Sequence, residues 1–588
     1  MAVSEKRTIA SLWDTAVAQN RTTPAYLVEE ESGWREVSWP EAAQAVDEIA
    51  HGLLALGVSK GDAFGILART RLEWSLFDFA LAHVGARAAA IYPSSTPSES
   101  RHILEDSEAI GVLVEGEDDL PLIEEARGLP GLKHVLTFAD LDGLREQGRE
   151  HAAQHPNAVA EAAAQIANDD LFTLIYTSGT TGPPKGCMIR NSNYFEMVRS
   201  STLVDQFFLP TDVLLLYLPL AHNFGRYMHL LGAHIGFTIA FCPDPRRLAE
   251  VMPAVRPTVM PTVPRVLEKV HTGVTANFAA ATGLKRRLID WALRVGHRVS
   301  ELRQAGKPIP AGLAAQHRIA DKLVYSKVKA RLGGRMRAVI SGAAPLSKEI
   351  AEFFLAIDVL ILEGYGQTEG TTAATCNLPD RFRFGTVGPA LPNVEVRIAD
   401  DGEILLRGPT VFAGYFGNEE ATREVLGEDG WLRTGDVGEL DDDGFLTITD
   451  RKRDIIITAG GKNLSPANIE NKLKGSPYVS QALVIGDRRP FVSALITLDP
   501  EEAEKWSQAK GFDGDMAGLA ARGEVRELVQ GIVDGVNADL ARFEQVRAFA
   551  VLPRDFLAEQ NEVTPTMKLR RKICQEHFAN EIEALYTA

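Results

Sequence analysis

The 588-residue chain lacks the features that mark secreted, membrane-spanning and metal-rich proteins. Its first residues, MAVSEKRTIASLWD, lack the apolar core of a signal peptide. The apolar runs 213–220 and 230–242 are shorter than the roughly 20 residues that cross a bilayer. Cysteine is scarce and shows neither a metal-ligand spacing nor a disulfide framework. The cysteines are Cys187, Cys242, Cys376 and Cys574. These absences predict a protein of the reducing cytoplasm.

Basic residues are outnumbered by acidic ones, 62 against 79, which gives a formal net charge of −17. This balance argues against a nucleic-acid partner, because such proteins usually carry a basic surface. An anionic substrate would have to meet a local basic site. Internal repeats and low-complexity tracts are also lacking. With 45% hydrophobic and 24% charged residues, the chain has the composition of a globular protein, and its length predicts two or more domains.

Short apolar segments alternate with amphipathic ones from Gly61 to Glu115, and this alternation predicts strands and helices of a βαβ architecture. After about Glu403 the texture changes to short hairpin strands with glycine turns. Beyond Gly460 a helix, two strands and then helices to the end are expected. The predicted fold class is α/β, with a large N-terminal domain (1–450) that includes a β-rich subdomain. A small α+β C-terminal domain (451–588) follows.

Residues 277–335 form a helix-rich, locally basic segment. Within 285–303 the apolar positions Leu288, Trp291, Val295, Val299 and Leu302 recur every three or four residues among lysines and arginines. One interpretation is an amphipathic helix packed on the protein surface. The other is peripheral contact with an anionic membrane, which basic amphipathic helices make.

The strongest chemical signal is the segment Leu171–Gly186, LFTLIYTSGTTGPPKG. An apolar strand leads directly into a loop of hydroxyl residues and glycines that ends in Lys185. Backbone amides approach an anion closely at glycines, hydroxyls donate hydrogen bonds, and the lysine adds charge, so a polyphosphate is the expected ligand. The loop does not match the P-loop GxxxxGK[ST], because Gly186 stands where serine or threonine is required.

TSGTTGPPKG resembles the phosphate-loop signature of the acyl-adenylating (AMP-forming) superfamily. Further blocks of that family follow in order along nearly the whole chain. They are PLAH (219–222), SGAAPL (341–346), EGYGQTE (363–369), WLRTGD (431–436), DRKRDIIITAGGKNLSP (450–466) and PTMK (565–568). Two features are similar to those of the long-chain fatty acyl-CoA synthetases. The hinge block follows closely after the segment 385–416, and the C-terminal lysine block has the form TPTMKLRRK. The resemblance implies a ligase that uses ATP, Mg²⁺ and coenzyme A, and a C-terminal domain that is mobile.

The resemblance also implies roles for individual residues. Glu369 and Thr177 match the metal-binding carboxylate and hydroxyl, and Asp436 matches the acid that grips the ribose. His222 matches a residue that borders the acyl pocket and the reacting carboxylate. The implied ATP-binding residues are Thr177, Ser178, Gly179, Thr180, Thr181, Gly182, Lys185, Gly342, Ala343, Gly364, Tyr365, Gly366, Gln367, Thr368, Asp436, Arg451 and Arg453.

The C-terminal blocks imply a two-step reaction. Lys568 matches the lysine that bridges the carboxylate and the α-phosphate during adenylation. The hinge residues are Asp450, Arg451, Lys452 and Arg453, of which Arg451 also matches a catalytic arginine. The glycine loop that approaches the thiol is Gly460, Gly461 and Lys462.

Three interpretations of the function stay open at this point. The first is transfer of a long-chain fatty acid to coenzyme A. The second is transfer of the same acyl-AMP to the pantetheine thiol of a carrier protein. The third is a binding protein without catalysis, against which the presence of Lys185, Glu369, Asp436, Arg451 and Lys568 speaks. The preferred acid and the oligomeric state are not predicted.

Overall fold

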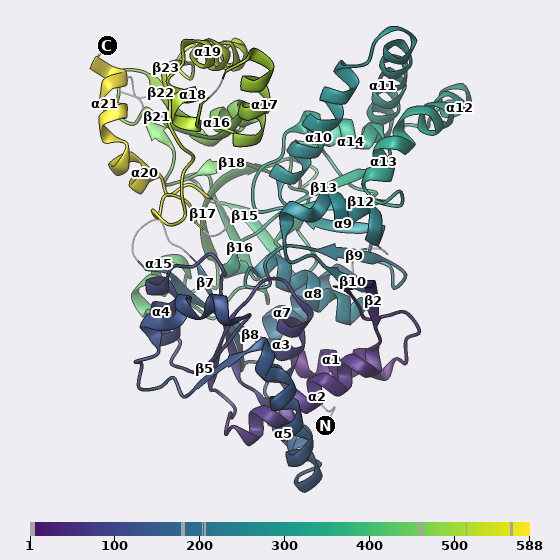
Figure 1. The fold of residues 1–588 in the computed structure, drawn as a ribbon, viewed down its shortest axis with the longest axis vertical. Coiled ribbons are helices and arrows are strands. Elements are labelled where there is room, and N and C mark those ends of the chain that lie inside the picture. The colour runs from purple at the N-terminus through teal and green to yellow at the C-terminus, as the bar shows by residue number, and fades with distance from the viewer. Residues whose placement is uncertain are drawn as a thin grey trace.

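The computed structural model describes residues 6–177, 183–202, 204, 207–457, 463–512, 514–564 and 568–587. Within these ranges the chain divides into a large N-terminal region with three sheets and a smaller C-terminal region with its own sheet (Figure 1). Four groups of buried apolar side chains stabilise the fold, and two of them belong to the C-terminal region alone. A helical segment, from α10 (Pro264–Ala279) to α13 (Ser326–Arg331), projects from the N-terminal region (Figure 1).

The first sheet carries the alternating segments that the sequence predicts. Its strands run parallel except for β8, which pairs antiparallel with β7. In spatial order they are β6 (His134–Thr137), β5 (Ala109–Val114), β3 (Ala63–Leu67), β4 (Arg87–Ile91), β7 (Leu171–Thr177) and β8 (Lys185–Arg190). The βαβ prediction is confirmed, since α3 (Leu72–Val84) and α4 (Pro97–Asp106) connect consecutive parallel strands.

The second sheet is also mainly parallel, and its central strands are short and fully buried. In spatial order they are β14 (Thr375–Cys376), β13 (Leu360–Tyr365), β12 (Ala338–Ser341), β11 (Val259–Thr262), β9 (Val213–Leu216), β10 (Thr238–Phe241), β1 (Tyr26–Glu30) and β2 (Gly33–Val37). The carboxyl ends of β12 and β13 lead into the SGAAPL and EGYGQTE blocks. The segments that the resemblance assigns to nucleotide binding therefore lie together at the carboxyl ends of two neighbouring parallel strands.

Helices cover and separate the two sheets. Besides α3, α4, α10 and α13, the N-terminal helices are α1 (Ile9–Ala18), α2 (Trp39–Ala55), α5 (Leu141–Gln154), α6 (Ala158–Ala164), α7 (Asn191–Thr202), α8 (Asn223–Ile235), α9 (Leu248–Val255), α11 (Gly283–Gln304), α12 (Ala311–Ala320), α14 (Lys348–Ala356) and α15 (Glu419–Val425). Because α8 contacts α1 and α7 as well as β9 and β10, it ties the second sheet to the helices of the first.

The β-rich subdomain is an antiparallel sheet of β15 (Glu395–Ile398), β16 (Glu403–Arg407), β17 (Leu432–Leu440) and β18 (Leu446–Arg451). The C-terminal sheet consists of β21 (Val479–Ile485), β22 (Val492–Leu498) and β23 (Val546–Val551), and β19 (Ile456–Ile457) pairs with β20 (Asn463–Leu464). The accompanying helices are α16 (Pro466–Lys474), α17 (Pro500–Lys510), α18 (Met516–Ala520), α19 (Gly523–Ala538), α20 (Arg571–His577) and α21 (Ala579–Thr587). The predicted α/β class with a small α+β C-terminal unit is confirmed, whereas the expectation of only helices after β22 is wrong because β23 intervenes. The boundary at 450/451 stays a prediction.

The amphipathic segment 285–303 lies within α11, and its apolar face is turned toward the protein. Val295 and Val299 are buried, and Leu288, Trp291 and Leu302 are half-buried. The helix packs against α14. The apolar stripe is therefore explained by packing within the chain, and only the beginning of α11 presents a large exposed apolar side chain, Leu284 at 81% exposure. Among the helices that the structure describes, no long apolar one could cross a membrane.

An ion pair between Arg226 on α8 and Asp78 on α3 is completely buried. Arg226 Nε donates to Asp78 Oδ2 at 3.0 Å, and Nη1 donates to Thr173 Oγ1 on β7 at 2.5 Å. The guanidinium also lies over the ring of Phe172 at 4.4 Å. The pair thus fixes the start of α8 against the strand that leads into the phosphate loop.

We expect Arg226→Met to lower the stability of the N-terminal region by about 3–5 kcal/mol, because the Asp78 carboxylate then stays buried without its partner. The double variant Arg226→Met with Asp78→Leu should lose much less, since both charges are removed. Thermal and urea unfolding followed by circular dichroism measure the effect. The control is Arg246→Met, which breaks an exposed pair with Asp244. Equal destabilisation by the single and double variants would contradict the argument.

Candidate active site

The phosphate loop connects two paired strands. β7 ends at Thr177, which lies opposite Lys185 at the start of β8. The Lys185 ammonium is 5.1 Å from the centre of the Tyr415 ring, a cation–π contact. Thr177 Oγ1 lies 3.8 Å from the Cys187 sulfur. The strands therefore place a hydroxyl and a positive charge at the two ends of the loop. The predicted binding residues Ser178, Gly179, Thr180, Thr181 and Gly182 lie outside the described residues.

Glu369 lies in the short 3-10 turn Thr368–Gly370 that follows β13. Its Oε1 accepts a hydrogen bond of 2.8 Å from the Tyr415 hydroxyl, so one tyrosine contacts both Glu369 and Lys185. The backbone of Tyr415 pairs with that of Cys187 in an isolated antiparallel β-bridge, and Phe416 N donates a hydrogen bond of 2.8 Å to Gly186 O. These two contacts hold Tyr415 beside β8. Burial raises the pKa of Tyr415, and the neighbouring Glu369 carboxylate raises it further. Tyr415 therefore stays protonated and donates to Glu369.

Small residues line the predicted nucleotide slot where β12 and β13 end. A Cβ on Gly366 would lie 1.8 Å from the Thr372 carbonyl oxygen, so only glycine fits there. A Cβ on Gly342 would lie 3.6 Å from the Gly364 carbonyl oxygen across the two chain segments. Ala343 adopts a positive φ of 69°. Gln367 caps the turn that holds Thr368 and accepts from Gly370 N at 3.1 Å. These predicted residues are thus brought together by neighbouring strand ends.

Tyr365, Asp436 and Arg451 converge from three different strands. The Tyr365 hydroxyl donates to Asp436 Oδ2 at 2.7 Å. Arg451 Nε lies 3.4 Å from Asp436 Oδ1, because Asp436 on β17 is directly opposite Arg451 on β18. Asp436 is buried, whereas Arg451 is about half exposed. The sequence predicted all three residues, but the hydrogen bond from Tyr365 to the acid emerges only from the structure.

His222 is the N-cap of α8. Its Nδ1 accepts a hydrogen bond of 3.1 Å from Phe224 N, so a neutral ring carries its proton on Nε2. Burial lowers the pKa of His222 to about 4, and the positive charge of Lys568 lowers it as well. At neutral pH the imidazole is uncharged and offers a hydrogen-bond donor.

Lys568 reaches the same site from the C-terminal region. Lys568 N donates to Thr564 Oγ1 at 3.0 Å, and Val563 pairs with Leu569 in an isolated antiparallel β-bridge. Burial lowers the pKa of Lys568 to about 8, and Arg451 contributes in the same direction, whereas Asp436 and Glu369 oppose the shift. The ammonium thus shares one electrostatic environment with residues of β17, β18 and the turn after β13.

The four predicted hinge residues lie at the end of β18 and just beyond it. Asp450 is buried, and its Oδ1 accepts from Arg451 N at 2.6 Å. Lys452 forms ion pairs with Asp401 at 2.7 Å and Glu403 at 2.9 Å. The charge of Arg453 acts on Tyr415. The thiol-side residues Gly460, Gly461 and Lys462 lie outside the described residues.

Sequence reasoning missed two residues of this site. Tyr415 contacts Lys185 and Glu369, but its segment, GPTVFAGYF, has no spacing that assigns it a role. Glu363 directly precedes the slot, and its Oε1 accepts from Leu346 N at 3.1 Å. Burial raises the pKa of Glu363 to about 7. Both depend on contacts between distant segments, which a single sequence does not display.

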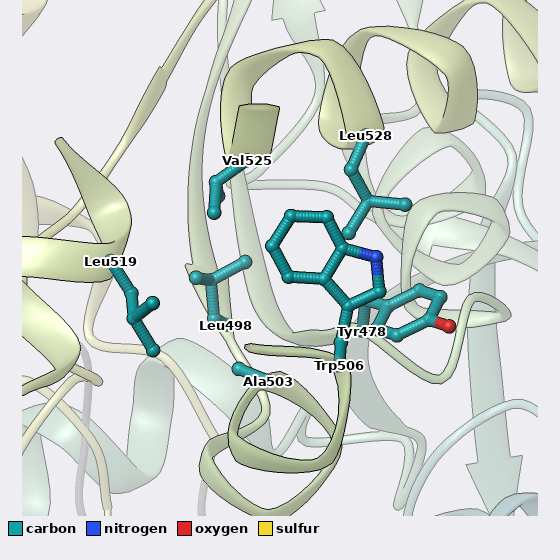
Figure 2. A pocket seen from close by; sticks show the side chains of 7 residues that line it. All are labelled: Tyr478, Leu498, Ala503, Trp506, Leu519, Val525 and Leu528. Atoms are coloured by element: carbon teal, nitrogen blue, oxygen red, sulfur yellow. The ribbon is translucent and has the colours of Figure 1, made fainter. Parts of the chain in front are cut away.

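A small apolar pocket lies away from this chemistry, within the C-terminal region. Figure 2 shows the indole of Trp506 facing Leu528 and Val525 across it. The lining residues are Tyr478, Leu498, Ala503, Trp506, Leu519, Val525 and Leu528. None of the predicted site residues lines this pocket, and its carbon-rich walls offer no charged group. It is a gap in the packing of α17, α18 and α19.

Two family models match the chain. The model described as AMP-binding enzyme matches residues 13–416, and the one described as AMP-binding enzyme C-terminal domain matches residues 453–588. In fold, the chain is similar to the adenylation domain of a carboxylate reductase from Mycobacterium chelonae. That crystal structure has a TM-score of 0.76 and 23% identity, covering 99% of this chain and 91% of the other. The fold class predicted from the sequence agrees with this similarity.

Curated relatives are similar over almost the same length. The long-chain-fatty-acid–CoA ligase FadD15 of Mycobacterium bovis is 40% identical over 578 residues, which cover 96% of this chain and 95% of that protein. The long-chain-fatty-acid–CoA ligase 6 of Mus musculus is 32% identical, covering 95% of this chain and 83% of that protein. Since the family models and these relatives together span nearly the whole chain, it belongs to the AMP-binding enzyme family, in the group of the long-chain fatty acid–CoA ligases.

Proposed function

We propose that this protein is an AMP-forming ligase that joins a long-chain fatty acid to coenzyme A. The observation that carries the proposal is the position of Lys568, whose charge acts within the same site as Glu369, Asp436 and His222. The proposed site therefore combines a lysine of the C-terminal region with the nucleotide-binding residues of the N-terminal region. The names of the relatives at 32–40% identity support a fatty acid and coenzyme A as substrates.

The first half-reaction joins two anions, so positive charge has to screen them. A carboxylate oxygen attacks the α-phosphorus of ATP, the bond to the bridging oxygen breaks, and pyrophosphate leaves. We assign Lys568 to the carboxylate and α-phosphate, and Lys185 to the departing phosphates. Asp436 accepts hydrogen bonds from the ribose hydroxyls. The Nε2–H of neutral His222 orients the substrate carboxylate without adding a charge.

Magnesium fits the oxygen donors of this site. Tyr415 orients the Glu369 carboxylate through one oxygen, and Thr177 supplies a hydroxyl at the end of β7, where the phosphate loop begins. Among the described residues no cluster of three or more His, Cys, Asp or Glu side chains could hold a metal. Mg²⁺ binds through one or two carboxylates together with phosphate oxygens and water, so Glu369 and Thr177 would suffice. When bound, the ion would neutralise phosphate charge.

In the second half-reaction the thiol sulfur attacks the acyl carbon, and AMP leaves. We propose that the C-terminal domain turns about Asp450–Arg453, which withdraws Lys568 and brings Gly460–Lys462 to the thiol. The pantetheine thiol of a carrier protein is the alternative acceptor, and leaving out coenzyme A while offering a carrier protein distinguishes the two. A cytoplasmic location is inferred from the four free cysteines.

The function is tested by measuring pyrophosphate release and acyl-CoA formation with fatty acids of increasing chain length. We expect long-chain acids to be preferred, and Lys568→Ala to slow acyl-AMP formation about 100-fold or more, as loss of a transition-state charge partner does. Transfer from preformed acyl-AMP to coenzyme A should persist. The control is Lys572→Ala, an exposed lysine on α20. Full adenylation by Lys568→Ala would refute the assigned role.

The rate of adenylation should fall as the pH rises through about 8, because Lys568 has a pKa of about 8 and acts as the charged ammonium. Below that pH the lysine is protonated and this dependence disappears. In Lys568→Arg the guanidinium stays charged, so any remaining activity should lack this alkaline decline. The measurement is a pH profile of pyrophosphate release in the absence of coenzyme A. An unchanged decline in the arginine variant would assign it to another group.

We further propose that the beginning of α11 contacts anionic membranes. Leu284 is followed there by Lys285, Arg286 and Arg287, and this apolar side chain within a basic cluster suits a lipid surface. Leu284→Ser with Lys285→Ser should reduce sedimentation with phosphatidylglycerol vesicles several-fold and leave binding to neutral vesicles unchanged. Phe543→Ser, which changes an exposed apolar side chain of the C-terminal region, is the control. Equal binding by all three proteins would refute this proposal.

A further inference from the structure

Close to Lys568 in the sequence, an ion pair joins the C-terminal region to the N-terminal region. Arg570 Nη2 lies 3.2 Å from Glu99 Oε1 on α4. The two side chains are only 10% and 20% exposed, in contrast to 59% and 61% for another contact between the two regions, Lys269 with Glu501. Shielding from water strengthens the Coulomb attraction between the two charges, so we expect the removal of one partner to disturb the Arg570–Glu99 contact more than the exposed one.

Glu99 is held in place by its own helix. It is the third residue of α4, and its Oε2 accepts from Thr96 N at 3.1 Å while Glu99 N donates to Thr96 Oγ1 at 3.2 Å. This capping box uses one carboxylate oxygen and leaves Oε1 for Arg570. Arg570 is likewise fixed from its own side, since its guanidinium contacts Asn561 and its backbone N donates to Glu562 O at 2.8 Å. Both partners are therefore oriented within their own regions of the chain.

The same helix contacts the chain at both ends of the phosphate loop. His102 Nε2 lies 2.8 Å from the carbonyl oxygen of Pro184, the residue before Lys185. The Tyr176 hydroxyl, one residue before Thr177, donates to Asp106 Oδ2 at 2.7 Å. Glu99, His102 and Asp106 are spaced three and four residues apart, so they share one face of α4. That face links the two ends of the phosphate loop to the segment 568–570.

We propose that Glu99 and Arg570 are positioning residues for adenylation, which hold Lys568 in the site by docking the segment 568–570 on α4. This inference rests on the proposed function of Lys568. Because α4 is fixed to both ends of the phosphate loop, the docked lysine is placed relative to the phosphates themselves. The pair must separate when the C-terminal domain turns, so it acts in the first half-reaction and is absent from the second.

The test measures the two half-reactions separately in the full-length enzyme. Adenylation is followed as pyrophosphate release from ATP and palmitate without coenzyme A, and thioester formation is followed from preformed palmitoyl-AMP. We expect Glu99→Gln and Arg570→Gln each to slow adenylation about 10-fold, and thioester formation to stay as fast or become faster. Glutamine at position 99 keeps the capping box, so α4 stays intact. The double variant should be no slower than either single variant, because both remove the same contact.

Two matched controls remove a charge from the same elements without breaking the pair. Glu105→Gln changes an exposed carboxylate on α4, and Lys572→Gln changes an exposed lysine on α20, and both should adenylate as the unaltered protein does. Additive losses in the double variant, or equal slowing of both half-reactions, would overturn the positioning role. If Lys568→Ala abolishes adenylation while Glu99→Gln and Arg570→Gln do not slow it, this inference fails and the proposed function stands. If Lys568→Ala itself adenylates normally, the proposed function fails.

Discussion

The arrangement of this site depends on the electrostatic interaction between the buried Lys568 ammonium and the acids around it. A cation removed from water is costly unless opposite charges compensate it. Asp436 and Glu369 supply that compensation, while burial and Arg451 act against it, and the outcome is a pKa of about 8. Each of these partners is in turn held by a tyrosine, Tyr365 for Asp436 and Tyr415 for Glu369. The two acids thus compensate the buried charge of Lys568, and the two tyrosines orient the acids through hydrogen bonds.

The fold meets this requirement by bringing together the ends of strands from different sheets. Asp436 and Arg451 come from the antiparallel subdomain, and Lys185 begins a strand of the first sheet. Tyr365 ends a parallel strand of the second sheet, and Glu369 lies in the turn after that strand. Tyr415 bridges the first and second sheets by contacting Lys185 and Glu369. In the proposed function one more separate segment, the one that contains Lys568, completes this site.

Local patterns predicted much of this structure. The alternation between Gly61 and Glu115 indicated the right strands and helices, because each βαβ unit is determined mainly by periodicity along the chain. The apolar stripe in α11 predicted a helix but left open whether it packs on the protein or contacts a membrane. The contact with α14 shows that most of the apolar face packs on the protein. β23 was missed because it enters the C-terminal sheet as a parallel partner of β22, separated from it by three helices. Tyr415 and Glu99 were missed for a related reason, since their partners are distant in sequence.

The neutrality of His222 follows from the same charge balance. A protonated imidazole beside the Lys568 ammonium would add a second buried cation to a site with two nearby carboxylates, and its pKa of about 4 prevents that at neutral pH. Neutral His222 therefore adds no further positive charge to a site that already contains Lys185, Arg451 and Lys568. Burial lowers the pKa of Lys568, so the charged form is favoured more strongly in water than in the site. Under the proposed mechanism Lys568 has to stay in the site during adenylation and leave it afterwards, so a contact that holds its segment has to be strong enough to position it and still able to break. The Arg570–Glu99 pair, partly shielded but lying between two regions of the chain, meets both conditions.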